Sequence, residues 1–438
     1  VGSEMCIRDR AGPIQEDALM RKVMRRIIPF IFICYVVSYL DRINVGFAAL
    51  QMNKDLGLTP SIFGLGAGLF FIGYFICEMP SNLALQRFGA RRWIARIMIT
   101  WGLISSLTAL VAGALGFSAA RLLLGMAEAG FTPGVYLFFT YWFPGPWRAR
   151  ATAAFLVGIP VANMIGSPIS GWLLTFNGLA GLHGWQWLFI IEGLPAVLLG
   201  LACLFLLADG PRQASWLTIR EQDWLAARLA EEQEMLAKRH GARLRDGFTS
   251  QVLVFALINF CGIVGSLGIG IWMPQIVKGF GLSYVATGIV SATPYAVAAV
   301  VMTLWGNAAA RSKRRVVYVV SALGIAAVAL ALSVFAGSHL LSMVALTFTV
   351  CGILGFQASF WALPTSFLTG RAAAAGLALI VSIGNLGGFV GPFMIGALRQ
   401  HTKGFTAPLL ATAAVLLFGA IVMALVGDPA RNTERSAP

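Results

Sequence analysis

Residues 27–50 read IIPFIFICYVVSYLDRINVGFAAL, and this stretch decides the class of fold. Apart from Asp41 and Arg42 it carries no charged side chain. It is also longer than the ~20 apolar residues that a helix needs to cross a bilayer. The stretch therefore predicts a membrane-spanning helix with an acid and a base side by side near its middle.

The whole chain has the composition of a membrane protein. Of its 438 residues, 58% are hydrophobic and only 11% are charged, against about 25% charged residues in a soluble protein. Only helices and closed barrels satisfy their backbone in lipid, and the apolar runs here are far longer than the ~10-residue segments of a barrel. We therefore expect an all-α membrane protein.

Twelve apolar runs separated by short polar breaks predict twelve spans in two six-helix halves. We expect the N-terminal half at 21–208 and the C-terminal half at 248–427, with a cytoplasmic loop that holds a surface helix at 209–247 between them. Residues 1–20 are interpreted as a disordered or non-native leader and 428–438 as a cytoplasmic tail. The predicted spans are 27–50, 60–82, 93–115, 118–142, 149–176, 185–208, 248–278, 283–306, 315–336, 339–368, 371–397 and 404–427.

The distribution of basic residues sets the expected orientation. Lys and Arg concentrate in the short loops on the side of the N-terminus, as at 87–96 and 311–315, and are sparse in the opposite loops. The positive-inside rule places both termini in the cytoplasm. The same bias explains the net charge of +14 without a nucleic-acid partner. The six cysteines and four histidines form no metal-binding pattern, so we expect no metal and no cofactor.

The two halves also share a loop pattern. NLALQRFGARR at 82–92 follows the second span, and GNAAARSKRR at 306–315 follows the eighth. Duplicated halves around a central site are typical of secondary transporters. We found no nucleophile–base pair, and we do not expect an enzyme.

These residues resemble the major facilitator superfamily. Its cytoplasmic gating loop is similar to G-x-x-x-D-R-x-G-R-R, which this chain matches at Arg87, Gly89, Arg91 and Arg92. The chain departs from that pattern at Asn82 in place of Gly and at Gln86 in place of Asp, which leaves the usual salt bridge of that loop without its acid.

A narrower resemblance is to the anion:cation symporter family, in the branch of tartrate, phthalate and hydroxyphenylacetate carriers. It rests on YLDRINVGFA (39–48), GMAEAGFTPG (125–134), GWQWLFIIEGLPAVLLG (184–200) and neighbouring motifs. It implies a multi-pass protein of the bacterial inner membrane that acts as a monomer.

Asp41 and Arg42 are expected to do different jobs. Adjacent residues of a helix do not share a face, whereas Arg42 does share one with Tyr39. We expect Arg42 and Tyr39 to face the cavity, with Arg42 holding a substrate carboxylate through its two-pronged guanidinium. The resemblance implies the same role, with Asp41 as a protonation site. The alternative is a structural salt bridge between helices.

Glu128 is the second expected proton-coupling residue. Arg121, Gly125 and Glu128 lie on one face of the fourth span, and a buried carboxyl can exchange protons near neutral pH. The resemblance implies that Glu128 couples protons and that Arg121 belongs to the same group. Alternatively, Glu128 is a neutral core acid and Arg121 extends to the outer surface.

Further cavity residues come from aligned positions. The resemblance implies substrate contacts for Tyr74 and Asn385, and a pocket shaped by Trp361 and Ser359. Packing is the alternative for the aromatic residues. Ile159 stands where sugar-acid carriers have a Gln, which favours a less hydroxylated substrate.

The sequence therefore predicts a secondary transporter that imports a small carboxylate, tartrate-like or aromatic, together with protons. Two alternatives stay open on the same fold, an organophosphate/phosphate antiporter and a multidrug/proton antiporter. The first is disfavoured because residues 250–277 carry no Lys, Arg or His.

Overall fold

A computed structural model describes residues 15–238, 249–368 and 370–427, and every regular element in these ranges is a helix. Twelve spans are long and apolar enough to cross a membrane, so the predicted all-α fold with twelve spans is confirmed. The first half contains α1 (Glu16–Asp55), α2 (Pro60–Phe88), α3 (Ala90–Leu107), α4 (Gly113–Glu128), α5 (Phe131–Thr140), α6 (Gly145–Leu156), α7 (Gly158–Leu173) and α8 (Gly184–Leu206). The second half contains α10 (Ser250–Lys278), α11 (Tyr284–Arg311), α12 (Arg315–Phe335), α13 (His339–Phe360), α14 (Pro364–Phe367), α15 (Gly370–Thr402) and α16 (Thr406–Val426).

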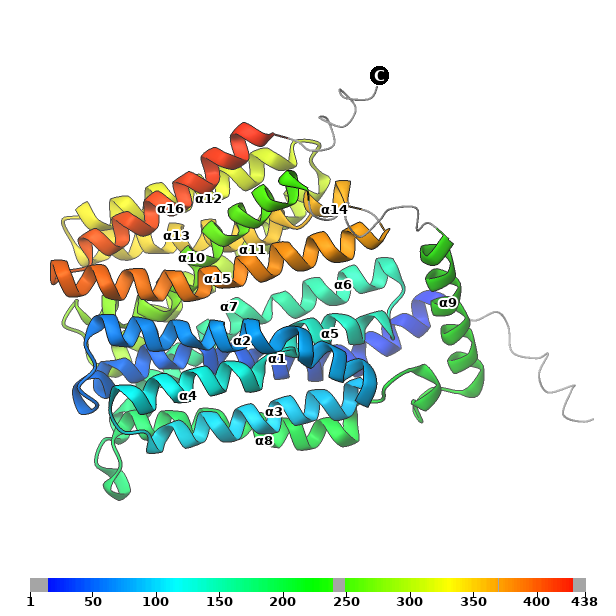
Figure 1. Ribbon diagram of the computed structural model, residues 1–438, viewed down its shortest axis with the longest axis horizontal. Helices are drawn as coiled ribbons and strands as arrows, with labels where there is room; N and C mark the ends of the chain where they lie inside the picture. The colour runs from blue at the N-terminus through cyan, green and yellow to red at the C-terminus, as the bar shows by residue number, and fades with distance from the viewer. Residues whose placement is uncertain (1–14, 239–248, 369, 428–438) are drawn as a thin grey trace, which may run out of the picture.

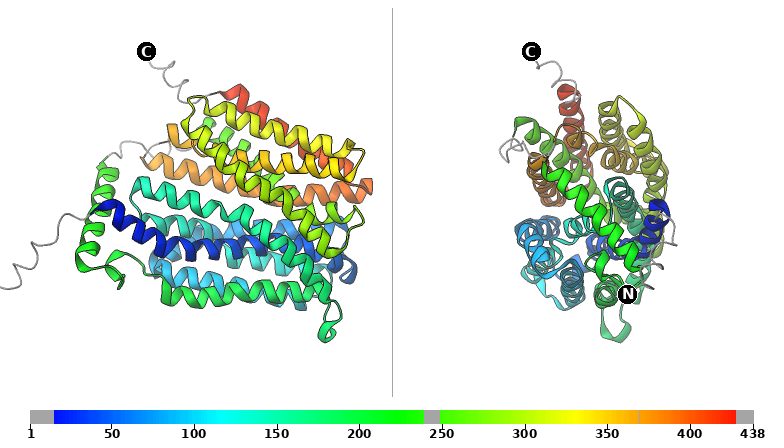
Figure 2. Two further views of the ribbon diagram at one scale, coloured as in Figure 1. Left: turned by 180° about the vertical axis from the view of Figure 1, so that it is seen from behind. Right: turned by 90° about the vertical axis from the view of Figure 1, so that its right-hand side faces the viewer.

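The helices form two bundles that lie side by side (Figures 1 and 2). Helices α1–α8 make one bundle and α10–α16 the other. Across the boundary, α2 packs against α15, α7 against α11 and α1 against α10. The boundary between the halves is therefore lined by α1, α2 and α7 of the first half and by α10, α11 and α15 of the second.

The first helix begins earlier than the sequence suggested. Residues 16–20, which we assigned to the leader, form the first turn of α1, and Leu19 and Met20 are buried. Glu16 and Asp17 in that turn suit the positive end of a helix dipole. Of the predicted leader, residues 1–14 lie outside the described residues, as does the predicted tail.

Among the described residues between the halves, the α-helix is α9 (Ile219–Lys238), which lies across the end of the first bundle (Figure 1). Its apolar side buries Leu225 and Leu229. Glu221 pairs with Lys22 of α1 at 2.8 Å, and Glu232 pairs with Arg148 of α6 at 3.1 Å. These contacts fix α9 to the first half.

The halves meet closely at the end opposite α9. The Ser61 amide near the start of α2 donates to the Gln400 side chain near the end of α15, at 3.1 Å. Gly171 and Gly288 let α7 and α11 approach so closely that a Cβ on either would meet the backbone of the other helix.

Two of the predicted spans in the first half are not continuous helices. The span expected at 118–142 is divided into α4 and α5 after Glu128, and the next is divided into α6 and α7 at Val157. The first division has a clear cause, because Gly130 adopts a left-handed conformation with φ 87°. Ser81 of α2 packs where a Cβ of Gly130 would lie.

Candidate functional site

The centre of the first bundle holds an ion pair between Arg42 of α1 and Glu128, the last residue of α4. Arg42 Nε donates to Glu128 Oε1 at 2.7 Å, and Nη2 lies 2.6 Å from the same oxygen. Ser38 Oγ also donates to that oxygen, at 2.8 Å. Glu128 is fully buried and its Oε2 has no hydrogen-bond partner among the described residues. The two residues that were expected to bind substrate and protons are therefore in direct contact.

Aromatic rings surround the Arg42 guanidinium. Its central carbon lies 5.2 Å from the ring centre of Tyr74, 5.7 Å from Phe70 and 6.0 Å from Tyr39. Such rings attract a cation through their faces. The Arg42 side chain keeps 14% of its surface exposed, while Glu128 keeps none. Arg42 is thus the accessible member of the pair.

Glu128 owes its position to the division of the fourth span. Gly125, one turn earlier, allows α4 to lie directly against the Phe70 backbone of α2. The chain then leaves the helix at Ala129 and resumes at Phe131. Interrupted helices provide polar sites in many transporters because they free backbone groups at membrane depth.

Asp41 faces away from this ion pair. Its Oδ1 accepts a hydrogen bond from Asn44 Nδ2 at 2.9 Å and another from Ser105 Oγ of α3. Asp41 is 1% exposed, and its Oδ2 lacks a hydrogen-bond partner among the described residues. The adjacent Asp41 and Arg42 therefore belong to different clusters, as the helical geometry predicted.

Arg121 lies inside the first bundle and does not extend to the surface. It is fully buried, with its guanidinium carbon 5.0 Å from the centre of the Phe70 ring. Its Nε, Nη1 and Nη2 have no hydrogen-bond partner within the described part of the chain. Asp41 and Glu128 both lie within electrostatic range, so Arg121 balances their charge without a direct bond to either.

Asn385 of α15 reaches the cluster from the second half. Its side chain meets the carboxyl group of Glu78, which stands one helical turn after Tyr74 on α2. Glu78 is not among the site residues that the sequence predicted. Its i+4 spacing from Tyr74 was the available signal that the two share a face.

Ser359 and Trp361 lie at the end of α13 in the second bundle. Ser359 Oγ donates to the Gly355 and Phe356 carbonyls of its own helix, at 2.8 and 3.3 Å. Trp361 packs edge-on against Phe360. Neither is among the residues that line the cavity described next.

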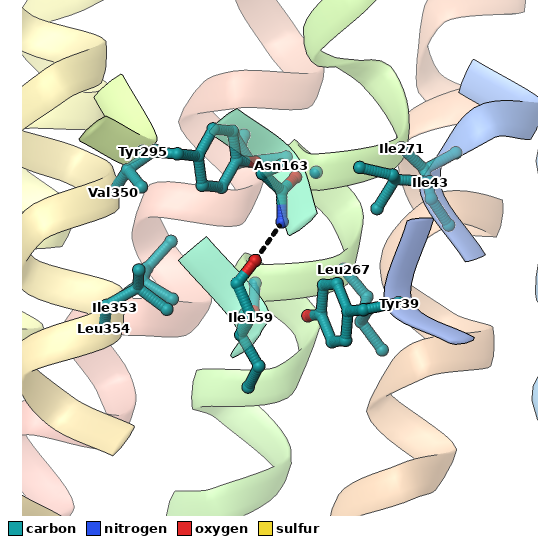
Figure 3. Close-up of a pocket in the computed structure, with 13 residues that line it drawn as sticks. Tyr39, Ile43, Ile159, Asn163, Leu267, Ile271, Tyr295, Val350, Ile353 and Leu354 are labelled. Carbon is teal, nitrogen blue, oxygen red and sulfur yellow. Dashed lines mark hydrogen bonds between the residues drawn. The ribbon is translucent and has the colours of Figure 1, made fainter. Parts of the chain in front are cut away.

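A small cavity lies between the two halves (Figure 3). Its walls are mainly branched aliphatic side chains, including Ile43, Ile159 and Ile353. The polar side chains that line it are Tyr39, Asn163, Ser266 and Tyr295. Tyr39 therefore joins the cavity to the Arg42 cluster.

Asn163 was missed by the sequence analysis. It is a polar residue in an apolar span, one turn after Ile159, and its Nδ2 donates to the Ile159 carbonyl at 3.0 Å (Figure 3). Ser266 and Tyr295 were also missed, because nothing in the sequence places α10 against α1 or α11 against α7.

The predicted gating-loop residues lie at the junction of α2 and α3. Gly89 has φ 85° and makes the turn between the two helices. The Arg91 amide donates to Asp209 Oδ1 at 2.8 Å, and Arg87 lies over the Phe88 ring at 5.6 Å, while Arg92 is exposed. Asp209, just beyond α8, thus brings to this loop the carboxylate that Gln86 does not supply.

Comparisons with known proteins agree with this architecture. The model of the family described as the Major Facilitator Superfamily matches residues 31–392 and 255–438. A protein from Agrobacterium vitis named "Putative tartrate transporter" is 47% identical over 93% of this chain and 91% of its own. A "Quinolone resistance transporter" from Acinetobacter baumannii is 42% identical over 94% of this chain and 95% of its own.

The fold also matches a solved structure. A bacterial homologue of the human lysosomal transporter Spinster, in an inward-facing and unoccupied conformation, superposes with a TM-score of 0.76. The match covers 94% of this chain and 97% of the other, at 16% identity. At this identity the likeness concerns the fold.

Proposed function

Because this chain belongs to the major facilitator superfamily of transporters, we propose that it imports a small organic carboxylate by proton symport. The substrate is tartrate-like or an aromatic acid. Arg42 binds its carboxylate, and Asp41 and Glu128 carry protons. The transporting unit is a monomer in the bacterial inner membrane, with both termini in the cytoplasm and no cofactor besides the coupling protons.

The observation that carries the proposal is the Arg42–Glu128 ion pair. A substrate carboxylate that binds Arg42 must displace the carboxylate of Glu128, and a buried charge without its partner costs several kcal/mol. Protonation of Glu128 removes that cost, because a neutral carboxyl can leave Arg42 and stay buried. Anion binding and protonation therefore favour each other, which is the requirement for symport.

The shape of the site supports a carboxylate with a compact body. Tyr39 lies beside Arg42 and also lines the apolar cavity. A substrate with its carboxylate at Arg42 would extend past Tyr39 toward Ile159 and Tyr295. The aliphatic walls of the cavity favour a substrate with an apolar body. The four polar side chains of the cavity can form hydrogen bonds with a few hydroxyl groups on that substrate.

Rocking of the two halves would expose the site to each side in turn. Moving an anion into a negatively charged cell costs about 2.3 kcal/mol per charge per 100 mV. Each proton carried with the anion offsets that cost.

The test is uptake of radiolabelled L-tartrate, phthalate and aromatic acids into proteoliposomes with and without an acidic outside. We expect at least one of these acids to accumulate only with the gradient, and a protonophore to abolish accumulation. Arg42→Ala should lose saturable uptake, whereas Arg228→Ala, which changes an exposed pair on α9, should retain it. Accumulation that ignores the gradient would refute proton coupling, and normal uptake by Arg42→Ala would refute the carboxylate site.

A drug/proton antiporter is the second candidate. It is favoured by the similarity to the quinolone resistance transporter and by the aliphatic walls of the cavity. The same proteoliposomes separate the two functions, because an antiporter expels its substrate toward the acidic side. The organophosphate alternative has less support, since Lys278 is the one cation on α10 and lies at its last residue.

A further inference from the structure

A third carboxyl group is buried in the first bundle. Glu192 of α8 is 4% exposed, and its Oε1 accepts a hydrogen bond from Ser170 Oγ of α7 at 2.7 Å. Its Oε2 has no hydrogen-bond partner among the described residues. A buried, ionised carboxylate with one oxygen lacking a hydrogen-bond partner costs several kcal/mol. We therefore ask which role would keep Glu192 at this position.

Asn44 connects Glu192 to Asp41. The Asn44 side chain is fully buried and donates from Nδ2 to Asp41 Oδ1 at 2.9 Å, and the Glu192 carboxyl group lies within its electrostatic range. Its Oδ1 lacks a donor in the described part of the chain. The Asn44 amide thus lies between Asp41 and Glu192, and its carbonyl oxygen is free to accept a hydrogen bond from a protonated carboxyl group.

The groups that face Glu192 and Asp41 do not offset the repulsion between the two carboxylates when both are ionised. Glu192 faces Asp41 and Asn44 of α1 and Ser170 of α7, and Asp41 lies within electrostatic range of it. Helix α3 contributes alcohols, Ser105 to Asp41 and Ser106 beside Gly193. The cation Arg121 is near Asp41 and is shared with Glu128. Like charges at such sites disfavour joint ionisation and titrate as a pair.

Glu192 lies nearer the outer end of the bundle than Asp41. His183, which precedes α8, contacts Asp55 at the end of α1 at 3.2 Å, so the two helices end at the same level. Glu192 is nine residues from His183 and Asp41 fourteen from Asp55, or roughly 14 Å and 21 Å along the helices. A proton that enters from outside therefore reaches the depth of Glu192 first.

We propose that Glu192 and Asp41 form one coupled acid pair, joined by Asn44, which binds a transported proton as a unit, with Glu192 as its outer member. The inference rests on the proposed proton symport and adds a residue to it. With one proton on the pair, the remaining negative charge is held by Asn44 and faces Arg121. Without that proton, the two carboxylates repel each other, so the pair takes up a proton more readily than a lone Asp41.

The experiment is the dependence of L-tartrate uptake on outside pH, in proteoliposomes that contain the full chain. In Glu192→Gln the repelling charge is absent, so uptake should need an outside pH lower by roughly one unit or more, while counterflow exchange at equal pH is retained. In Ser170→Ala the Glu192 carboxylate loses its hydrogen-bond donor, so the pH dependence of uptake should shift toward higher outside pH. Glu232→Gln, the same substitution outside the membrane, should leave it unchanged.

Infrared titration of the substrate-free protein gives a second readout that does not need transport. Wild type should show a protonated carboxyl band that Glu192→Gln lacks. If wild-type uptake ignores the pH gradient, the proposed symport fails, and the infrared band alone decides whether the pair exists. An unshifted pH profile in Glu192→Gln, or an unchanged band, would overturn the pair.

Discussion

At the scale of single residues, the adjacent Asp41 and Arg42 act in two separate environments. Arg42 turns toward Glu128 and three aromatic rings, and Asp41 turns toward α3 and Asn44. A step of one residue rotates a side chain by about 100° on a helix, which is enough to separate them. The pair therefore does not neutralise itself, and each charge depends on partners from other helices.

Replacing Glu128 by Gln should uncouple transport from protons. Gln mimics the protonated acid and frees Arg42 permanently, so counterflow exchange of L-tartrate should be retained. Accumulation against a gradient should fall about tenfold per pH unit for each coupled proton that is lost. Exchange should also depend less on pH, because this group no longer titrates. Loss of both exchange and accumulation would instead assign Glu128 a structural role.

At the scale of helices, the interruption after Glu128 positions the site. Gly130 makes a left-handed turn in the middle of a membrane span, and α5 starts at Phe131 directly after it. The sequence GMAEAGFTPG contained the glycine, yet its apolar surroundings suggested an unbroken helix at 118–142. The contact with Ser81 of α2 selects the break, and that contact exists only in the folded bundle.

Substituting Gly130 by Ala should destabilise the protein more than the same change at Gly113. Both glycines have positive φ, 87° and 62°, and an L-residue there costs roughly 1–2 kcal/mol. A Cβ at Gly113 meets open space, whereas at Gly130 it would collide with Ser81. Thermal unfolding of the detergent-solubilised variants should therefore give a lower Tm for Gly130→Ala than for Gly113→Ala. Equal decreases in Tm would show that the Ser81 side chain moves aside at no cost in stability.

At the scale of the whole molecule, the two halves hold each other at one end. Ser61 bonds to Gln400, and Gly171 and Gly288 bring α7 and α11 into backbone contact. These contacts join helices from different halves at the end of the molecule opposite α9. Under the proposed rocking of the two halves, this is the end that is closed in this structure.

A large side chain at Gly288 should prevent that closure. Already the Cβ of a Leu at Gly288 would collide with the Ser167 carbonyl, whereas a Cβ at Gly324 on α12 meets nothing within 4 Å. We expect Gly288→Leu to abolish transport. It should also lengthen the distance between spin labels at Lys54 and Lys403, measured by double electron–electron resonance spectroscopy. Gly324→Leu should match wild type in both. An unchanged distance in Gly288→Leu would refute a rocking motion that closes at this contact.

Most of the fold could be predicted from the sequence, because a bilayer imposes a strong local rule. Each span needs a long apolar run, so the twelve spans and the two halves follow from hydropathy alone. The burial of Asp41 and Glu128 also followed, since charges at membrane depth face the bundle interior, whereas the sequence left Arg121 open between the interior and the outer surface. The start of α1 was placed too late because its first turns lie outside the apolar run.

What the sequence determined by itself is the set of helices and the charges within them, since both depend on neighbours in the chain. Only the tertiary structure decided which charges meet: Arg42 with Glu128, Glu78 with Asn385, and Glu192 with Asp41 through Asn44. These partners lie on different helices, and hydropathy does not distinguish one helix packing from another. The position of a carboxyl group is set by the close packing of small residues such as Gly125 and Gly130, and that packing is a property of the assembled bundle.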